Sequence, residues 1–292
     1  MRFVRLEALA LVFACLVSGS AAAEPTGEQW ARVLNLSGRQ RMLTQKMSKE
    51  ALFITHGVEA DRLRGDLAGT TTLFEETLAA LRDGDESLGL PATENPRIVK
   101  QLDEVQSMYL ELKPLFDAVA AGAVLSAEQT RDLASKNPPL LKEMNKAVKM
   151  YERSAKKTLT GDAKSAVVIN LAGKQRMLTQ KMTKECLLVQ LDVSASDNLL
   201  NLRETTSLFD RTLAGLIGGD EDLELPATTD PETRAQLDRV SALWSEIAPT
   251  FQAVLSGDRS LSKEELANLA TANVELLKEM NKGVRLFEQA AN

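Results

Sequence analysis

The decapeptide GRQRMLTQKM at residues 38–47 recurs as GKQRMLTQKM at residues 173–182, 135 positions later, and the copies differ only at Arg39 and Lys174. The same offset relates LGLPAT at 88–93 to LELPAT at 223–228, and LLKEMNK at 140–146 recurs at 276–282 after one extra residue. Each repeat has about 130 residues, which is too long for a solenoid unit and suits an independent bundle. The sequence therefore predicts two homologous domains, at residues 24–158 and 159–292.

Each repeat has the pattern of four helices. In the first repeat we expect them at residues 28–55, 61–82, 96–121 and from 126 onwards. Ser126 with Gln129, and Ser262 with Glu265, have the spacing of capping boxes that start the fourth helix. Only two Trp and two Tyr occur, and Ala, Leu, Glu, Lys and Gln are frequent, as in helical bundles. We predict an all-α fold of two tandem four-helix bundles.

The first helix of each repeat is apolar on two sides. At 100° per residue one stripe holds Leu36, Leu43, Met47 and Ile54, and a second stripe about 160° away holds Ala31, Leu34, Gly38, Met42, Gln45 and Leu52. A helix that is apolar on two sides is buried on two sides, so we expect the bundles to pack through their first helices. Gly38 and Gly173 favour a close approach there, because a mid-helix glycine costs roughly 0.5–1 kcal/mol relative to alanine.

Arg41 and Arg176 lie at the edge of this second stripe. Two guanidinium groups that meet in a desolvated seam repel each other, and the nearest acid, Glu50, is more than two turns away. The planar fork of arginine matches a planar oxyanion, so the residues predict a small trigonal anion between the helices. The candidate ligand-binding residues are Arg41, Arg176, Gly38, Gly173, Gln45, Gln180, Asn35 and Asn170.

The pattern N-L-[SA]-G-[RK]-Q-R-M-L-T-Q-K-M, at residues 35–47 and 170–182, resembles the signature helix of PilJ-type sensor domains. It is similar also to the periplasmic box of NarX-type nitrate/nitrite sensors. The resemblance covers both repeats and implies that nitrate binds at a two-fold interface between two signature helices, with Arg41 and Arg176 as the main contacts. Family members usually carry membrane helices and a kinase or methyl-accepting part, which the sequence to Asn292 lacks. We therefore expect ligand recognition that is reported to a membrane-bound receptor, kinase or transporter.

The N-terminal segment has the features of a secretory signal peptide cut after Ala23. Arg2 and Arg5 precede an apolar run at 8–17 and small residues at 21–23. We expect a soluble periplasmic protein, although a retained anchor stays open; the run is shorter than the ~20 residues of a spanning helix. Removing residues 1–23 changes the formal charge from −6 to −7, and so acidic a chain is a poor partner for nucleic acid. Only Cys186 then remains, which excludes an intrachain disulfide.

Other polar residues have plain structural interpretations. Six cations of the first helices are expected on a solvated face: Arg39, Lys174, Lys46, Lys181, Lys49 and Lys184. His56 is expected on the surface, Cys186 in the core, and four methionines as core filler: Met42, Met47, Met177 and Met182. No catalytic set, phosphate loop or metal-ligand cluster occurs in the sequence, so neither enzymatic activity nor a cofactor or metal is expected.

A second hypothesis treats the repeated motif as purely structural. Arg41 and Arg176 would then be ion-pair partners of acids such as Glu75 or Glu204, and the protein would be a structural or adaptor bundle. The sequence leaves open whether one chain holds one shared site or two sites, and whether it forms a homodimer.

Overall fold

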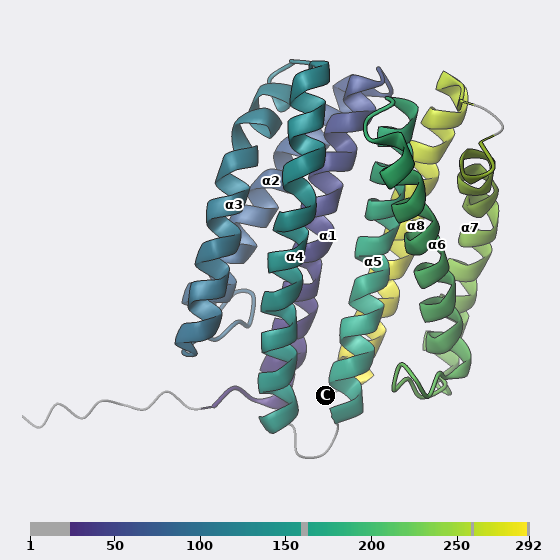
Figure 1. Cartoon of the computed structure of the whole chain (residues 1–292). Helices are drawn as coiled ribbons and strands as arrows, with labels where there is room; N and C mark the ends of the chain where they lie inside the picture. Colours follow the sequence, from purple (N-terminus) through teal and green to yellow (C-terminus); the bar gives the residue numbers. More distant parts are fainter. Residues whose placement is uncertain (1–23, 159–162, 258–259, 291–292) are drawn as a thin grey trace, which may run out of the picture.

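A computed structural model describes residues 24–158, 163–257 and 260–290, which form eight α-helices and no β-strand (Figure 1). The first bundle consists of α1 (Gly27–Thr55), α2 (Ala60–Asp83), α3 (Pro96–Ala120) and α4 (Ala127–Thr158). The second consists of α5 (Ala163–Gln190), α6 (Ala195–Gly218), α7 (Pro231–Leu255) and α8 (Lys263–Ala290). This confirms the predicted fold class. The predicted signal peptide lies outside the described residues.

The helix starts follow from local sequence. The Ser126 hydroxyl accepts from the Gln129 backbone at 3.2 Å, while the Gln129 side chain accepts from the Ser126 N–H at 2.9 Å. Ser262 and Glu265 make the same reciprocal pair at the start of α8. Both predicted capping boxes are therefore confirmed, and Thr26 forms another one at the start of α1.

The two bundles meet through α1 and α5, which lie side by side at the centre of the molecule (Figure 1). These two helices contact each other more extensively than any other pair. Between Trp30 and Ile54 nearly every residue of α1 is buried, including both apolar stripes of the helix. The predicted packing through the first helices is confirmed, and each bundle wraps its other three helices around one side of this seam.

The two bundle cores are built alike. Phe74 and Tyr109 pack with ring centroids 4.7 Å apart in the first bundle, and Phe209 and Trp244 pack at 4.6 Å in the second. These residues occupy equivalent places at the offset of 135. The repeated sequence thus gives two similar scaffolds, which bring the two copies of the decapeptide face to face.

Within the described part of the chain, no helix has both the length and the apolar character needed to cross a membrane.

Candidate functional site

Two glycines set the distance between α1 and α5. An ideal Cβ built on Gly38 would lie 4.0 Å from the Cα of Gly173, and the reverse pair gives the same distance. The Cβ on Gly38 would also lie 3.4 Å from Arg41 Nη2 and 3.5 Å from Arg176 Nη2, and the Cβ on Gly173 would be as crowded. Both guanidinium groups therefore occupy the space that two missing side chains leave, which explains the mid-helix glycines.

Each arginine reaches across the seam to the opposite helix. Arg41 Nη2 donates to the main-chain oxygen of Asn170 at 3.1 Å, and Arg176 Nη2 donates to that of Asn35 at 3.0 Å. Arg176 Nη1 donates further to Asn35 Oδ1 at 2.9 Å and to Asn281 Oδ1 at 3.3 Å. Within the described residues Arg41 makes one hydrogen bond and Arg176 three, so the two halves share a plan but differ in detail.

Two carboxylates stand behind the asparagines. Asn35 Nδ2 donates to Glu288 on α8, and Asn170 Nδ2 donates to Glu152 on α4 at 2.6 Å. Glu50, the nearest acid along α1, instead pairs with Lys46. Arg176 thus binds the side-chain amide oxygen of Asn35, whose nitrogen is held by Glu288, whereas Arg41 binds only the main-chain oxygen of Asn170.

The arginines are costly to bury in this arrangement. Arg41 is 4% exposed and Arg176 is 3% exposed. Burial lowers the pKa of Arg41 to about 10, against the opposing influence of Glu152. Burial, and after it the charges of Arg39 and Arg41, lowers the pKa of Arg176 to about 9. Both groups remain protonated at neutral pH, and a desolvated pair of cations favours an anion between them.

The ion-pair hypothesis for these arginines is wrong in its partners. Glu75 accepts from Tyr109 at 2.8 Å and pairs with Lys113 at 3.0 Å, and Glu204 is exposed on α6. Among the described residues neither Arg41 nor Arg176 forms a salt bridge, because their partners are amide and main-chain oxygens.

Gln45 and Gln180 lie one turn further along, in a different set of contacts. Gln45 Oε1 accepts from Lys184 Nζ at 2.8 Å, and its Nε2 donates to Thr44. Gln180 Nε2 donates to Thr179, and Gln180 Oε1 is buried without a partner among the described residues. The structure therefore brings together six of the predicted site residues, namely the two arginines with the two glycines and the two asparagines, and places the two glutamines in a second polar layer.

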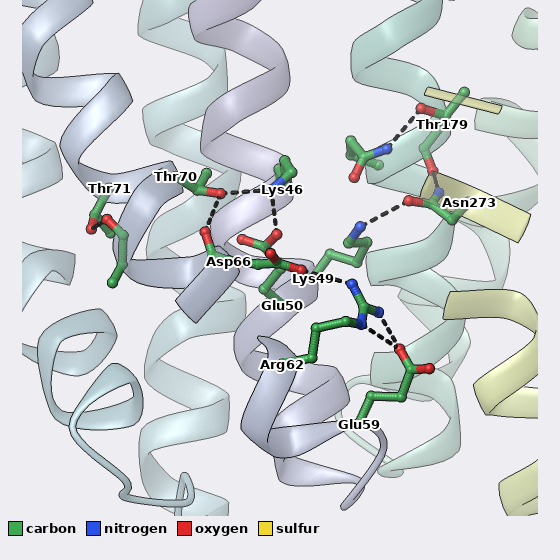
Figure 2. Close-up of polar contacts among 12 residues, drawn as sticks. Lys46, Lys49, Glu50, Glu59, Arg62, Asp66, Thr70, Thr71, Thr179 and Asn273 are labelled. Atoms are coloured by element: carbon green, nitrogen blue, oxygen red, sulfur yellow. Dashed lines mark hydrogen bonds and ion pairs between the residues drawn. The ribbon is translucent and has the colours of Figure 1, made fainter. Parts of the chain in front are cut away.

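Two buried lysines define this second layer. Lys49 is 2% exposed and its Nζ donates to Asn273 Oδ1 on α8 at 2.8 Å, as Figure 2 shows. Lys184 is 4% exposed and donates to Asn137 Oδ1 on α4 at 2.7 Å as well as to Gln45. Each lysine therefore crosses the seam and binds the fourth helix of the other bundle. The prediction that Lys49 and Lys184 lie on a solvated face is wrong.

Neighbouring cations are also less solvated than expected. Lys46 pairs with Glu50 and donates to Thr70 at 2.6 Å (Figure 2), and Lys181 makes the equivalent contacts with Glu185 and Thr205. Both ammonium groups therefore have protein partners, although their side chains keep 21% and 23% of their surface exposed.

Arg39 and Lys174, the one difference between the decapeptides, are only partly exposed and line two separate clefts.

Three further expectations have mixed outcomes. His56 is partly buried rather than on the surface, and its Nε2 donates to the Leu187 main-chain oxygen at 3.1 Å. Burial lowers the pKa of His56, and its hydrogen bond links α1 to α5. Cys186 is fully buried, as predicted, and burial raises its pKa to about 12. The four methionines are core residues, as predicted: Met42, Met47, Met177 and Met182.

Sequence reasoning missed the residues that the fourth helices contribute. Asn137 Nδ2 donates to the Thr44 main-chain oxygen at 2.9 Å, and Asn273 Nδ2 makes the same bond to Thr179. The signal was present, because Asn137 and Asn273, like Glu152 and Glu288, occupy equivalent positions of the two repeats at an offset of 136. Long segments separate them from the decapeptide, which hid their role.

Both arginines can be approached from the surface, each from its own side. Arg41 lines a cleft of about 710 Å³ between α4 and the α5–α6 pair. Arg176 lines a cleft of about 400 Å³ bounded by α1, α2 and α8. In the described ranges, no group of three or more His, Cys, Asp and Glu side chains could hold a metal ion.

Comparison with known proteins matches this chain twice to one family. The PilJ family model, described as the N-terminal part of type IV pili methyl-accepting chemotaxis transducers, matches residues 26–137 and 158–270. A methyl-accepting chemotaxis protein of Pseudomonas aeruginosa, McpN, is 32% identical over 128 residues, which are 44% of this chain and 23% of that protein. The chain thus spans about a quarter of the length of this relative. With both decapeptides inside matched segments that together cover most of its length, this chain belongs to the PilJ family of chemotaxis transducer N-terminal domains.

Proposed function

We propose that this protein is a periplasmic sensor or binding protein for a small planar oxyanion, nitrate or nitrite, held between Arg41 and Arg176. The observation that carries the proposal is the convergence of both Nη2 atoms over the facing glycines Gly38 and Gly173. Membership of a family of chemotaxis transducer domains supports a sensory role. The resemblance of the decapeptides to a nitrate-binding signature helix supports the choice of anion.

The arrangement suits a planar monoanion in charge and shape. Each guanidinium now donates to a main-chain oxygen that is already within a helix, so an anion can take over those donors. Charge-assisted hydrogen bonds contribute ~1.5–3 kcal/mol each, so four of them reach roughly micromolar affinity, about −8.2 kcal/mol, after ordering costs. Asn35 and Asn170, held by Glu288 and Glu152, would supply amide groups at the rim.

Signalling would follow from the position of the site between the bundles. α1 and α5 belong to different bundles, so an anion gripped by both arginines would favour one relative placement of the two. A ligand shifts a conformational equilibrium only by its difference in affinity for the two states. We propose that a membrane-bound partner reads this change in placement.

Titration calorimetry tests the proposal with nitrate, nitrite, sulfate, phosphate, chloride and acetate. We expect nitrate or nitrite to bind most tightly and, at 100 times Kd, to raise the free energy of unfolding by about 2.7 kcal/mol. Arg41→Ala should abolish nitrate binding. Arg211→Ala should retain it, because Arg211 is an exposed residue of α6 that pairs with Asp220. Equal responses to all anions would reduce the effect to ionic strength.

The alternative function is a structural or adaptor bundle. It is favoured by one observation, that the arginines already bind the main chain of the opposite helix. On this alternative no anion binds, and both arginine variants lose stability because the seam loses its cross-links. The same titrations, combined with urea unfolding of the variants without ligand, distinguish the two functions.

A further inference from the structure

The cleft beside Arg41 is unusually rich in positive charge for a chain whose formal charge is −6. It has a volume of about 710 Å³ and lies where α4 meets α5 and α6. Two carboxylates line it, Glu143 and Glu185, against eight cations: Arg41, Lys142, Lys146, Lys149, Arg153, Lys174, Lys181 and Lys184. A concave basic surface on an acidic protein focuses its field on anions in solution.

Four of these cations form a row along one face of α4. Lys142, Lys146, Lys149 and Arg153 are spaced at i, i+4, i+7 and i+11, which extends the row over ~16 Å. Lys146 pairs with Glu143 at 3.2 Å. The other three are exposed and form no ion pair within the described ranges.

The opposite wall of the cleft continues the row toward the seam. Lys174 on α5 lines the same cleft, and its pKa is lowered first by burial and then by the charges of Arg41 and Lys149. Arg41 is buried and its Nε has no hydrogen-bond partner in the described part of the chain. The positive charges therefore run from the exposed face of α4 to the buried floor, with few acids between them.

The equivalent cleft of the other half is smaller and less basic. It has a volume of about 400 Å³ and is lined by four cations, Arg39, Lys46, Arg176 and Arg285, and by Asp66. Asp66 stands where the larger cleft has Asn201, and Gln289 stands where α4 has Arg153. Lys278, the counterpart of Lys142, pairs with Glu275. Seven of the eight cations have a Lys or Arg counterpart in the other repeat, so the two clefts differ in charge mainly through Arg153 and through Asp66.

We propose that the cleft between α4 and α5–α6 binds a small elongated anion with three or more negative charges, such as a phosphate chain or a polycarboxylate. Its volume lies within the ~300–1,000 Å³ of small-molecule sites. The row favours several linked charges, because a single small ion contacts one or two of its cations. Lys142, Lys149 and Arg153 lie outside the arginine seam, so this site goes beyond the oxyanion site.

Calorimetry with tripolyphosphate and citrate, at about 0.15 M salt, tests the proposal and distinguishes the two chemistries. We expect at least one of them to bind, with sulfate and nitrate much weaker at this cleft. Lys149→Gln combined with Arg153→Gln should weaken the bound polyanion about tenfold or more. Arg285→Gln, at the position equivalent to Lys149, is the matched control and should change the affinity less than about twofold.

The nitrate titration is repeated on the same variants. It should be unchanged in the Lys149 and Arg153 variant, so failure of the nitrate proposal and failure of this one are separable. Circular dichroism confirms that these exposed substitutions leave the helices intact.

Three results overturn the inference. The first would be that neither tripolyphosphate nor citrate binds at this salt concentration. The second would be that Arg285→Gln weakens their binding as much as the α4 variant does. An oligoglutamate peptide that binds this cleft more tightly than both small anions would identify it as a docking surface for an acidic protein instead.

Discussion

Lys49→Met tests whether the second polar layer of the seam is as dry as the structure indicates. Burial lowers the pKa of Lys49 to about 7 and that of Lys184 to about 8, from an ordinary value of 10.5. Between about pH 8 and pH 10 the unfolded chain therefore binds protons that the folded chain has released. Stability is lost as pH falls through this window, and the free energy of unfolding rises with pH by about 1.4 kcal/mol per pH unit for each lysine.

Removing Lys49 removes its share of this dependence. We expect the rise in the free energy of unfolding of Lys49→Met to be smaller than that of the wild type by about 1.4 kcal/mol per pH unit. The level of stability is less informative than its pH dependence, because the variant also leaves Asn273 Oδ1 without its donor, which costs about 1–3 kcal/mol at any pH.

Urea unfolding followed by circular dichroism measures this from about pH 8 to pH 9.5. Lys142→Met, which removes an exposed lysine from α4, is the control and should keep the wild-type dependence. Identical pH dependences in wild type and Lys49→Met would refute the reasoning, since they would show that Lys49 keeps its proton in the folded protein.

The remaining predictions concern the arginine layer. Calorimetry should show one nitrate bound per chain. Arg41→Ala and Arg176→Ala should each remove nearly all binding, and the double variant should bind no more weakly than either single variant. Two nitrates per chain, with one site surviving in each single variant, would contradict a shared site. Without ligand, Arg176→Ala should lower the urea-derived stability by about 1–3 kcal/mol, whereas Arg41→Ala should stay near wild type, because Arg176 makes three hydrogen bonds and Arg41 one. Gly38→Ala should leave the fold intact, because a gain of about 0.5–1 kcal/mol in helix propensity offsets the crowding. The variant should nevertheless weaken nitrate binding at least about tenfold, because the new methyl group displaces both Nη2 atoms. Gly65→Ala, where nothing lies within 4 Å of the new Cβ, is its control and should leave affinity unchanged.

Periodicity and repetition carried most of the fold prediction. The two apolar stripes of α1 indicated two partners, and the repeat named the second partner, α5. Gly38 and Arg41, one turn apart, were enough to place a guanidinium at the helix crossing. These inferences succeeded because they depend on residues within a few turns of one helix and on its copy.

The lysine layer escaped prediction for a physical reason. Whether Lys49 meets water depends on α8 of the other bundle, whose Asn273 lies 224 residues away. The amide of Asn35 is likewise held by an acid that the local pattern does not reveal, Glu288, 253 residues away. A charge pattern on one helix does not reveal which partner covers it, and only the packed seam shows that these side chains satisfy one another.

Joining the two copies of the signature helix in one polypeptide has a consequence for evolution. When two identical chains form a two-fold site, every substitution appears on both sides at once, so the halves cannot specialise. In this protein each repeat can mutate alone. Three pairs of equivalent positions have diverged in this way: Arg39 and Lys174, Asp66 and Asn201, and Arg153 and Gln289. The seam can keep a nearly symmetric centre while the clefts beside Arg41 and Arg176 acquire different charges.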